Sequence, residues 1–234
     1  MKNILVTGGS GTIGTAIVKL LLSFGHNVWI VDKNEPVYDC EARFIKCDVT
    51  QYEKLKKKLA ESFSTKEITD IITIAGGGLT NEWLPFEETE IETIRESIDI
   101  NLLGHIYTLH AALPYMDKND IDKSFTMISS INGKAAYSMA GYSSAKAGLE
   151  GFMYGIAKEM GKRGVRVNIV SPGTVVTELT LKEEKKDWEK LKKETLTGNF
   201  ATVQDIATLV AMVIGNKSIV GQNIVIDSGQ LIKK

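Results

Sequence analysis

Short apolar runs alternate with amphipathic segments along almost the whole chain. Seven runs are rich in Val and Ile and have few polar interruptions, which is typical of strands covered on both faces; they lie at residues 3–6, 27–31, 43–47, 68–74, 124–128, 166–170 and 223–226. Between most of them, apolar residues recur at helical spacing, over residues 13–24, 51–63, 88–116, 142–163 and 203–214. This alternation predicts an α/β fold, with a doubly wound parallel sheet, helices on both faces and one domain over residues 1–234.

One segment departs from this alternation. Residues 181–196 are heavily charged (LKEEKKDWEKLKKETL), with Leu181, Trp188 and Leu191 as the main apolar positions. A solvated helix explains this pattern, but a position just after a strand end also fits a lid over a site. We therefore delimit residues 177–202 as a candidate substrate loop or lid.

Composition excludes several classes of protein and partner. The 28 basic and 29 acidic side chains are interspersed, so no broad positive field is expected and nucleic acid is not a predicted partner. Cys40 and Cys47 lack a CxxC spacing and cannot form a disulfide framework, which predicts a reducing, cytoplasmic location. The three histidines have no metal-ligand spacing, and no apolar run is long enough to span a membrane. We expect neither a metal nor a membrane partner.

A glycine-rich turn follows the first predicted strand. Residues 7–14 (TGGSGTIG) precede the first predicted helix, where glycines let backbone N–H groups and the helix N-terminus face a pyrophosphate. The second strand ends at Asp32, whose carboxylate suits a ribose 2′-hydroxyl and repels a 2′-phosphate. A Rossmann-like site that favours NAD(H) over NADP(H) is predicted. Lys33 and Lys2 are cations that would favour NADP(H), and Asp32 also fits a simple turn residue.

A tyrosine four residues before a lysine places both on one face of a helix. Three such pairs occur in the chain, namely Tyr52/Lys56, Tyr142/Lys146 and Tyr154/Lys158. Only Tyr142 lies at the start of a predicted helix and shortly after a buried strand that ends in Ser129 and Ser130. This context favours the Tyr142/Lys146 pair as the one that carries chemistry.

Taken together, these motifs resemble the short-chain dehydrogenase/reductase superfamily in its single-domain form. The resemblance covers essentially the whole chain. It rests on the glycine turn, CDV at 47–49, AGG at 75–77, DINLLG at 99–104, Ser129-Ser130, the Tyr142/Lys146 pair, VNIVSPGTVVT at 167–177 and VGQNIVIDSG at 220–229. The resemblance implies an NAD(P)-dependent oxidoreductase that interconverts a secondary alcohol and a ketone by hydride transfer.

The resemblance also implies the roles of individual residues. Tyr142 would be the general acid/base, Lys146 would lower the pKa of Tyr142 and bind the nicotinamide ribose, and Asn101 would hold a water in a proton relay. Ser130 matches the family's Ser-x-x-Gly phrase and would orient the carbonyl, whereas the usual spacing between serine and tyrosine would select Ser129.

Further positions match the family's cofactor and substrate contacts. Asp48 corresponds to the position that meets the adenine amino group, and Val175 and Thr177 to positions that contact the nicotinamide carboxamide. The cofactor-binding set is Gly8, Ser10, Gly11, Thr12, Ile13, Gly14, Asp32, Asp48, Val49, Ala75, Gly76, Tyr142, Lys146, Pro172, Gly173, Val175 and Thr177. Candidate substrate-wall residues are Gly78, Trp83, Ser130, Tyr137, Met139 and Trp188.

Two other functions are compatible with parts of the sequence. The chain could be a catalytically silent dinucleotide-binding sensor or assembly module. The spacing of Gly8, Gly11 and Gly14 resembles that of sugar-nucleotide epimerases and dehydratases, which carry a C-terminal substrate domain that we do not expect here. The leading expectation is a small-molecule oxidoreductase, and its resemblance to family members implies a homotetramer or homodimer formed through the helices at 88–116 and 142–163.

Overall fold

Seven parallel strands form the centre of the protein in a computed structural model, which describes residues 1–38, 40–64, 68–116, 122–135, 139–176 and 188–233. The strands run in the spatial order β3-β2-β1-β4-β5-β6-β7, and every neighbouring pair is parallel. They are β1 (Asn3–Thr7), β2 (Asn27–Asp32), β3 (Arg43–Lys46), β4 (Asp70–Thr73), β5 (Lys123–Ile128), β6 (Val165–Pro172) and β7 (Asn223–Ile226). The predicted doubly wound α/β fold is confirmed.

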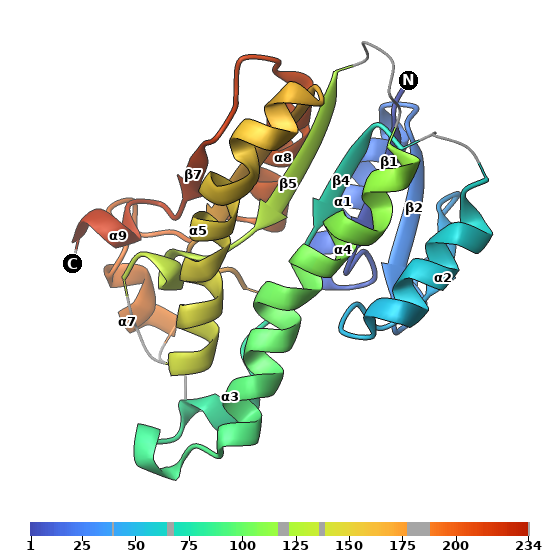
Figure 1. Ribbon diagram of the computed structural model, residues 1–234. Helices are drawn as coiled ribbons and strands as arrows, with labels where there is room; N and C mark the ends of the chain where they lie inside the picture. The colour runs from blue at the N-terminus through green and yellow to red at the C-terminus, as the bar shows by residue number, and fades with distance from the viewer. Residues whose placement is uncertain (39, 65–67, 117–121, 136–138, 177–187, 234) are drawn as a thin grey trace.

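Helices cover both faces of this sheet (Figure 1). One face packs against α2 (Tyr52–Ser62), α4 (Gly104–Ala112) and α5 (Ala140–Lys162), and the other against α1 (Thr12–Ser23) and α8 (Val203–Gly215). The strands are apolar on both sides because each face contributes to a separate core: Leu5 and Phe125 pack under α2, α4 and α5, whereas Ile4 and Val6 pack under α1 and α8. The short helices α7 (Trp188–Lys193) and α9 (Gln230–Lys233) lie near the carboxyl ends of the strands.

The helix expected over residues 88–116 is present from Ile91 onward, but it is not a single regular α-helix. This stretch instead contains a 3-10 turn (Phe86–Glu88), α3 (Ile91–Ile98), a π-helical turn (Asp99–Leu103), α4 and a second 3-10 turn (Leu113–Tyr115). Pro114 cannot donate a backbone hydrogen bond and so favours the end of α4 at Ala112. The π-helical turn surrounds Asn101, one of the predicted site residues, and turns of this kind are frequent at functional sites.

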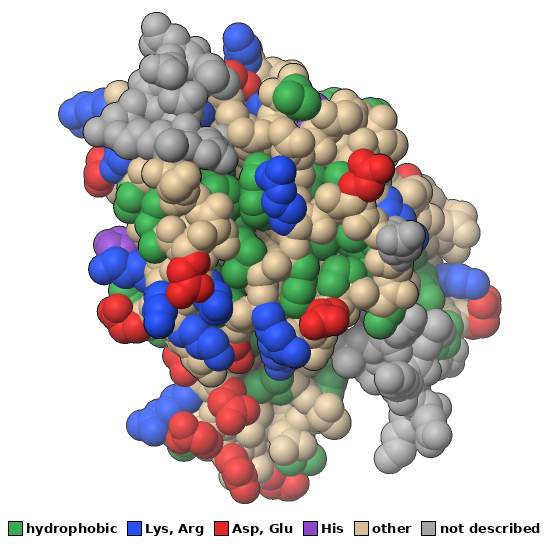
Figure 2. Space-filling view, turned by 90° about the vertical axis from the view of Figure 1, so that its right-hand side faces the viewer, with side chains coloured by type: hydrophobic (Ala, Val, Ile, Leu, Met, Phe, Trp, Pro, Cys, Tyr) green, Lys and Arg blue, Asp and Glu red, His purple; other side chains and the backbone are tan. Residues whose placement is uncertain are grey.

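Surface charge agrees with the balanced composition. Figure 2 shows basic and acidic side chains intermingled on one face, with hydrophobic side chains exposed between them. Among the described helices, none has the length and apolar character needed to cross a bilayer.

The order of the strands reverses at the centre of the sheet. The chain winds outward from β1 in one direction and from β4 in the other, which leaves a crevice at the carboxyl ends of these strands.

Candidate functional site

A cleft of about 1120 Å³ opens at the carboxyl ends of β1, β4 and β5, where the strand order reverses. Its lining combines the glycine turn after β1, the segments that follow β2, β4, β5 and β6, and the first turns of α5. Ligands of doubly wound sheets bind at this position because the strand ends and helix N-termini converge there.

Close backbone packing shapes the glycine turn. Gly8 has a φ of +74°, and a Cβ atom there would lie 2.5 Å from the backbone nitrogen of Ala75, at the end of β4. At Gly14, a Cβ would meet the Gly8 carbonyl oxygen and lie 2.7 Å from the Cα of Gly9. The absence of side chains thus brings the turn against β4 and holds the N-terminus of α1 at the cleft, through Thr12 and Ile13. This cradle fits a dinucleotide pyrophosphate.

Asp32 lies at the end of β2 on the same side of the cleft. Its carboxylate accepts hydrogen bonds from the backbone N–H groups of Ser10 and Asn34, both at 3.1 Å. Asp32 therefore both ties the glycine turn to the segment after β2 and presents a negative charge to the ligand cleft. The interpretation as a turn residue and the interpretation as a ribose ligand are compatible.

Of the two cations expected to oppose Asp32, only Lys33 lines the cleft. Lys2 lies at the opposite end of the sheet, where its Nζ is 3.0 Å from Asp70 and donates to the carbonyl oxygen of Ile214. The expectation that Lys2 influences the cofactor turn is wrong, because Lys2 precedes β1 and the turn follows it. The full length of β1 (Asn3–Thr7) therefore separates Lys2 from the glycine turn.

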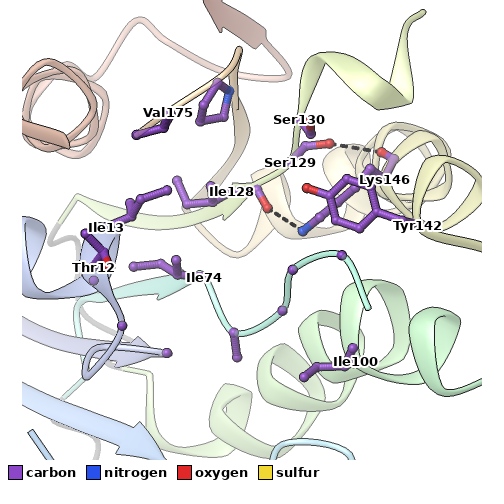
Figure 3. Close-up of a pocket in the computed structure, with 18 of the residues that line it drawn as sticks. Thr12, Ile13, Ile74, Ile100, Ile128, Ser129, Ser130, Tyr142, Lys146 and Val175 are labelled. Atoms are coloured by element: carbon purple, nitrogen blue, oxygen red, sulfur yellow. Dashed lines mark hydrogen bonds between the residues drawn. The ribbon is translucent and has the colours of Figure 1, made fainter. Parts of the chain in front are cut away.

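Tyr142 and Lys146 lie side by side next to the end of β5, and Ser130, which follows that strand, lines the same cleft (Figure 3). The first turns of α5 carry Tyr142 and Lys146, and the Lys146 Nζ lies 5.7 Å from the centre of the Tyr142 ring. Nζ also donates a 2.9 Å hydrogen bond to the carbonyl oxygen of Ile128, which fixes the buried lysine beneath the tyrosine. Ser130 lies close enough to Tyr142 to oppose the rise in the pKa of its phenol.

The two neighbouring serines have different surroundings. Ser129 is buried and donates a 3.0 Å hydrogen bond to the backbone carbonyl of Lys146, so its hydroxyl joins β5 to α5. Ser130 is half-buried, contacts Tyr142 and accepts a 3.1 Å hydrogen bond from the N–H of Asn132. The geometry thus favours Ser130 over Ser129 for contact with a substrate.

Burial dominates the proton equilibria of this cluster. It lowers the pKa of Lys146 to about 7, from 10.5. The pKa of Tyr142 is raised, first by burial and then, against the opposing effect of the Ser130 hydrogen bond, by the charge of Glu82. With a pKa of about 7, Lys146 is about half protonated at neutral pH. The expectation that Lys146 lowers the pKa of Tyr142 stays a prediction.

His105 extends the cluster beneath Lys146. It is 1% exposed, its Nδ1 lies 2.7 Å from the hydroxyl of Thr73, and its Nε2 has no hydrogen-bond partner among the described residues. Burial and then the charge of Lys146 hold the pKa of His105 well below its ordinary value. A neutral imidazole thus lies within the electrostatic reach of the lysine without adding a competing charge.

Asn101 lies behind the cleft wall rather than on it. Its side-chain oxygen accepts a 2.8 Å hydrogen bond from the N–H of Gly77, and its amide donates to the carbonyl oxygens of Gly77 and Ser97, both at 3.0 Å. The residue is fully buried. These contacts fix the wall segment after β4. The expected role of Asn101 in holding a water stays a prediction.

Most of the expected cofactor and substrate positions converge on the cleft. All the predicted cofactor residues except Thr177 line it, as do the candidate substrate residues Gly78, Trp83, Ser130 and Met139. Thr177 and Tyr137 lie outside the described residues. Trp188 is not on the wall and packs against Phe200 instead, with ring centres 5.9 Å apart.

Sequence reasoning missed several wall residues. Lys190, Leu191 and Glu194, within or just after α7, line the cleft, so the described part of the 177–202 segment does border the site. Gln230 reaches it from α9, where its side-chain oxygen accepts a 3.0 Å hydrogen bond from the N–H of Thr174. No local sequence motif marks these wall residues, because the segments that they meet in the cleft are distant in the chain.

The other two tyrosine–lysine pairs lie elsewhere. The Tyr52 hydroxyl is 2.6 Å from Nδ1 of His110 on α4. Tyr154 is 63% exposed and donates to Glu150 on its own helix. Neither tyrosine lines the cleft, whereas Tyr142 does.

Comparisons with known proteins agree with this geometry. The family model described as short chain dehydrogenase matches residues 2–189. The chain is 32% identical over 219 residues to an acetoacetyl-CoA reductase of Synechocystis sp., covering 91% of this chain and 88% of the relative. It is 27% identical to a 3-oxoacyl-(acyl-carrier-protein) reductase of Rickettsia conorii, with 99% and 97% of the two chains covered.

A solved structure supports the same assignment. A short chain dehydrogenase/reductase family oxidoreductase from Burkholderia thailandensis superimposes with a TM-score of 0.87 at 28% identity, covering 99% of this chain and 93% of that chain. The family match spans the glycine turn, the Tyr142/Lys146 pair and the strands between them. The chain belongs to the short-chain dehydrogenase/reductase family and is an NAD(P)-dependent oxidoreductase.

Proposed function

We propose that this enzyme interconverts a ketone and a secondary alcohol, with NAD(H) as the favoured cofactor and Tyr142 as the group that transfers the proton. The observation that carries the proposal is the convergence of Tyr142, Lys146 and Ser130 on the cleft that holds the glycine turn. A bound nicotinamide supplies or accepts the hydride. The residues of this chain have to bind both ligands, orient the carbonyl and move one proton.

In the direction of reduction, Tyr142 donates its phenolic proton to the carbonyl oxygen as the hydride reaches the carbon. Ser130 orients that oxygen by a hydrogen bond, and in oxidation the phenolate form of Tyr142 accepts the alcohol proton. The raised pKa of Tyr142 keeps it protonated at neutral pH, which suits reduction. We assign Asn101 a positioning role, because its side-chain hydrogen bonds to the Gly77 backbone hold the cleft wall after β4 in place.

The preference for NAD(H) rests on charge at the end of β2. Asp32 presents its carboxylate to the cleft and is held there by the N–H groups of Ser10 and Asn34. A 2′-phosphate at this position would meet a fixed negative charge, whereas a 2′-hydroxyl can donate to it. Lys33 is the cation on the same wall that opposes this preference.

Ketone chemistry is supported by the relatives. Both reductases named above act on 3-oxoacyl compounds, which carry a ketone. The substrate side of the cleft offers Gly78, Leu79, Trp83 and Met139, a mixed apolar wall suited to a carbon chain or ring. Lys190 and Glu194 add charge at its border.

Replacing Tyr142 with Phe tests this function. NADH-dependent reduction of acetoacetyl-CoA and a panel of simple ketones should fall by about a thousandfold, because the general acid is lost. NADH affinity, measured by fluorescence titration, should remain close to that of the wild type. The matched control is Tyr154→Phe, an exposed tyrosine on the same helix, which should retain full activity.

The same assay separates the two serines and the competing functions. Ser130→Ala should lower turnover by about a hundredfold and Ser129→Ala much less, because only Ser130 contacts Tyr142. Undiminished turnover in Tyr142→Phe would contradict the proton-transfer role. NADH binding without turnover of any ketone or alcohol by the wild type would instead favour the silent module.

A further inference from the structure

Glu82 is a buried carboxylate that the proposed chemistry does not use. It lies in the 3-10 turn Thr80–Trp83, and only 3% of it is exposed. Its Oε1 accepts a 2.8 Å hydrogen bond from the backbone N–H of Tyr142. Its Oε2 accepts from the hydroxyl of Ser97 at 2.9 Å and from the N–H of Leu79 at 3.1 Å. Both oxygens therefore act as acceptors, and the carboxylate bridges segments from three parts of the chain.

The contact with Tyr142 is made at the N-terminus of α5. Met139 precedes this helix with a φ of 60° and provides no side-chain cap. The first N–H groups of a helix have no partners within it and carry partial positive charge, so a carboxylate stabilises them. Gly141 allows the approach, because a Cβ there would lie 2.7 Å from Oε1 of Glu82. Glu82 therefore caps α5 from a position distant in sequence.

The same carboxylate is linked to Asn101. The Ser97 hydroxyl that donates to Glu82 lies 3.4 Å from the side-chain nitrogen of Asn101, and that nitrogen donates to the carbonyl oxygens of Ser97 and Gly77. One network thus connects α3, the wall after β4 and the helix that carries Tyr142 and Lys146. Removing Glu82 would leave the buried N–H of Tyr142 without its acceptor.

We propose that Glu82 is a positioning residue for proton transfer: its carboxylate holds the first turn of α5 in place and puts a fixed negative charge at the backbone of Tyr142. This inference deepens the proposed function and rests on it for its catalytic meaning. A negative charge disfavours the phenolate, and the charge of Glu82 contributes to the raised pKa of Tyr142. Glu82 thereby helps to keep the proton on the donor.

Other charged groups near Tyr142 differ from Glu82 in position. Lys146 lies on the same helix and His105 packs beneath that lysine, whereas Lys190 and Glu194 border the cleft from the α7 side. The charged side chains on α3, which packs against α5, are exposed; they are Glu92, Arg95 and Glu96. Of these groups, only Glu82 is a buried anion that is hydrogen-bonded to the backbone of Tyr142.

Titration of Tyr142 by NMR tests the proposal without requiring turnover. Tyrosine isotopically labelled at Cζ reports ionisation, and the Tyr142→Phe variant assigns the resonance. In Glu82→Gln, the ratio of ionised to neutral Tyr142 at a given pH should rise about threefold or more, which corresponds to a midpoint lower by about half a unit. Glu87→Gln is the matched control, because Glu87 is exposed in the next 3-10 turn; it should leave the titration unchanged.

A folded Glu82→Gln protein whose Tyr142 titrates as in the wild type, or at higher pH, would overturn the proposal. If Glu82→Gln does not fold, Ser97→Ala tests the same point, because it removes one donor that partly neutralises the carboxylate. Tyr142 should then ionise at higher pH than in the wild type, and an unchanged or lower midpoint contradicts the inference. Far-UV circular dichroism at each pH establishes that the fold persists.

Activity gives a second, separable measurement. The alkaline decline of ketone reduction should move to lower pH in Glu82→Gln and stay in place in Glu87→Gln, a change that a merely structural defect does not produce. Should the wild type reduce no ketone while its Tyr142 titration still depends on Glu82, the proposed function fails and the electrostatic inference stands. An activity that survives with a pH profile independent of Glu82 contradicts the inference alone.

Discussion

The two walls of the cleft are held by different kinds of contact. On the cofactor side, backbone meets backbone: Gly8 packs against Ala75, and its N–H donates a 2.9 Å hydrogen bond to Val31. On the side of Tyr142, side chains bridge distant segments, as Glu82 joins the 3-10 turn before α3 to α5 and Ser129 joins β5 to α5. The shape of the first wall depends on how closely backbone segments can pack. The shape of the second wall depends on side-chain hydrogen bonds between distant segments.

This difference predicts two modes of failure. Adding a single carbon to the cofactor wall forces backbone apart, whereas substitutions on the opposite wall change charge and hydrogen bonding with less change in packing. Ser129 and Ser130 illustrate the second mode, because the Ser129 hydroxyl joins β5 to α5 whereas the adjacent Ser130 lines the cleft. Three substitutions test the contrast, beginning with the largest expected effect.

Gly14→Ala should damage the cofactor wall most. The new methyl would meet the Gly8 carbonyl and the Cα of Gly9, which are backbone atoms that cannot rotate away. We expect the free energy of unfolding to fall by about 3 kcal/mol, together with a large loss of NADH affinity. Urea denaturation and fluorescence titration measure the two effects.

Gly155→Ala is the control for this substitution. Gly155 lies within α5, and nothing is within 4 Å of a Cβ built there. The free energy of unfolding should rise by about 0.5 to 1 kcal/mol, because alanine is the better helix former. Equal destabilisation by both variants would show that crowding against the glycine turn is not the cause.

Lys146→Met should stabilise the protein at neutral pH. Burial lowers the pKa of Lys146 from 10.5 to about 7, so between these values the unfolded chain binds a proton that the folded chain does not. Wild-type stability therefore rises with pH across this window, and the penalty is full only below the folded-state pKa of about 7. The variant lacks the penalty, and we expect it to be more stable than the wild type by about 2 kcal/mol near neutrality, after loss of the bond to Ile128.

Denaturation of both proteins across the pH range measures this effect. The difference should shrink as the pH approaches 10.5. The control is Lys158→Met, an exposed lysine on the same helix, for which no such pH-dependent difference is expected. A difference that is constant over the whole range would mean that packing, not desolvation of the ammonium, separates the variant from the wild type.

Asp32→Ala should have the smallest effect on the protein and act on selectivity. Removing the carboxylate abolishes both repulsion of a 2′-phosphate and acceptance from a 2′-hydroxyl, so the ratio of kcat/KM for NADH over NADPH should fall by about tenfold. Lys33→Ala should move the ratio in the opposite direction, because Lys33 is the cation on the same wall. If neither variant alters the ratio, selectivity is set elsewhere in the cleft.

Hydrophobic periodicity predicted the sheet and the principal helices because each strand and helix must bury its own apolar residues. The exceptions have local physical causes. The expected helix at 88–116 is interrupted by a π-helical turn, in which Asn101 bonds to Gly77, and α4 ends before Pro114. Hydrophobic periodicity does not reveal that a polar side chain such as Asn101 is buried and hydrogen-bonded to the backbone of a distant segment.

The site was predictable where motif and position coincide. The glycine turn, Asp32, Tyr142 and Lys146 were identified from short segments, and all of them line the cleft. Glu82 and Gln230 carry no motif, and Lys2 was misplaced because nearness in sequence to the turn hid the length of β1 between them. The lowered pKa of Lys146 and the raised pKa of Tyr142 were not expected, because the degree of burial is a property of the folded protein.

The sequence by itself determined the α/β alternation, the family and the tyrosine–lysine pair that lines the cleft, because these depend on residue type and on spacing within short segments. Only the tertiary structure decided which serine meets Tyr142, that Asn101 braces the wall, and that Glu82 caps α5. Those outcomes depend on distances between distant segments and on the removal of water from charged groups. Both are set only when the folded sheet brings the carboxyl ends of its strands together.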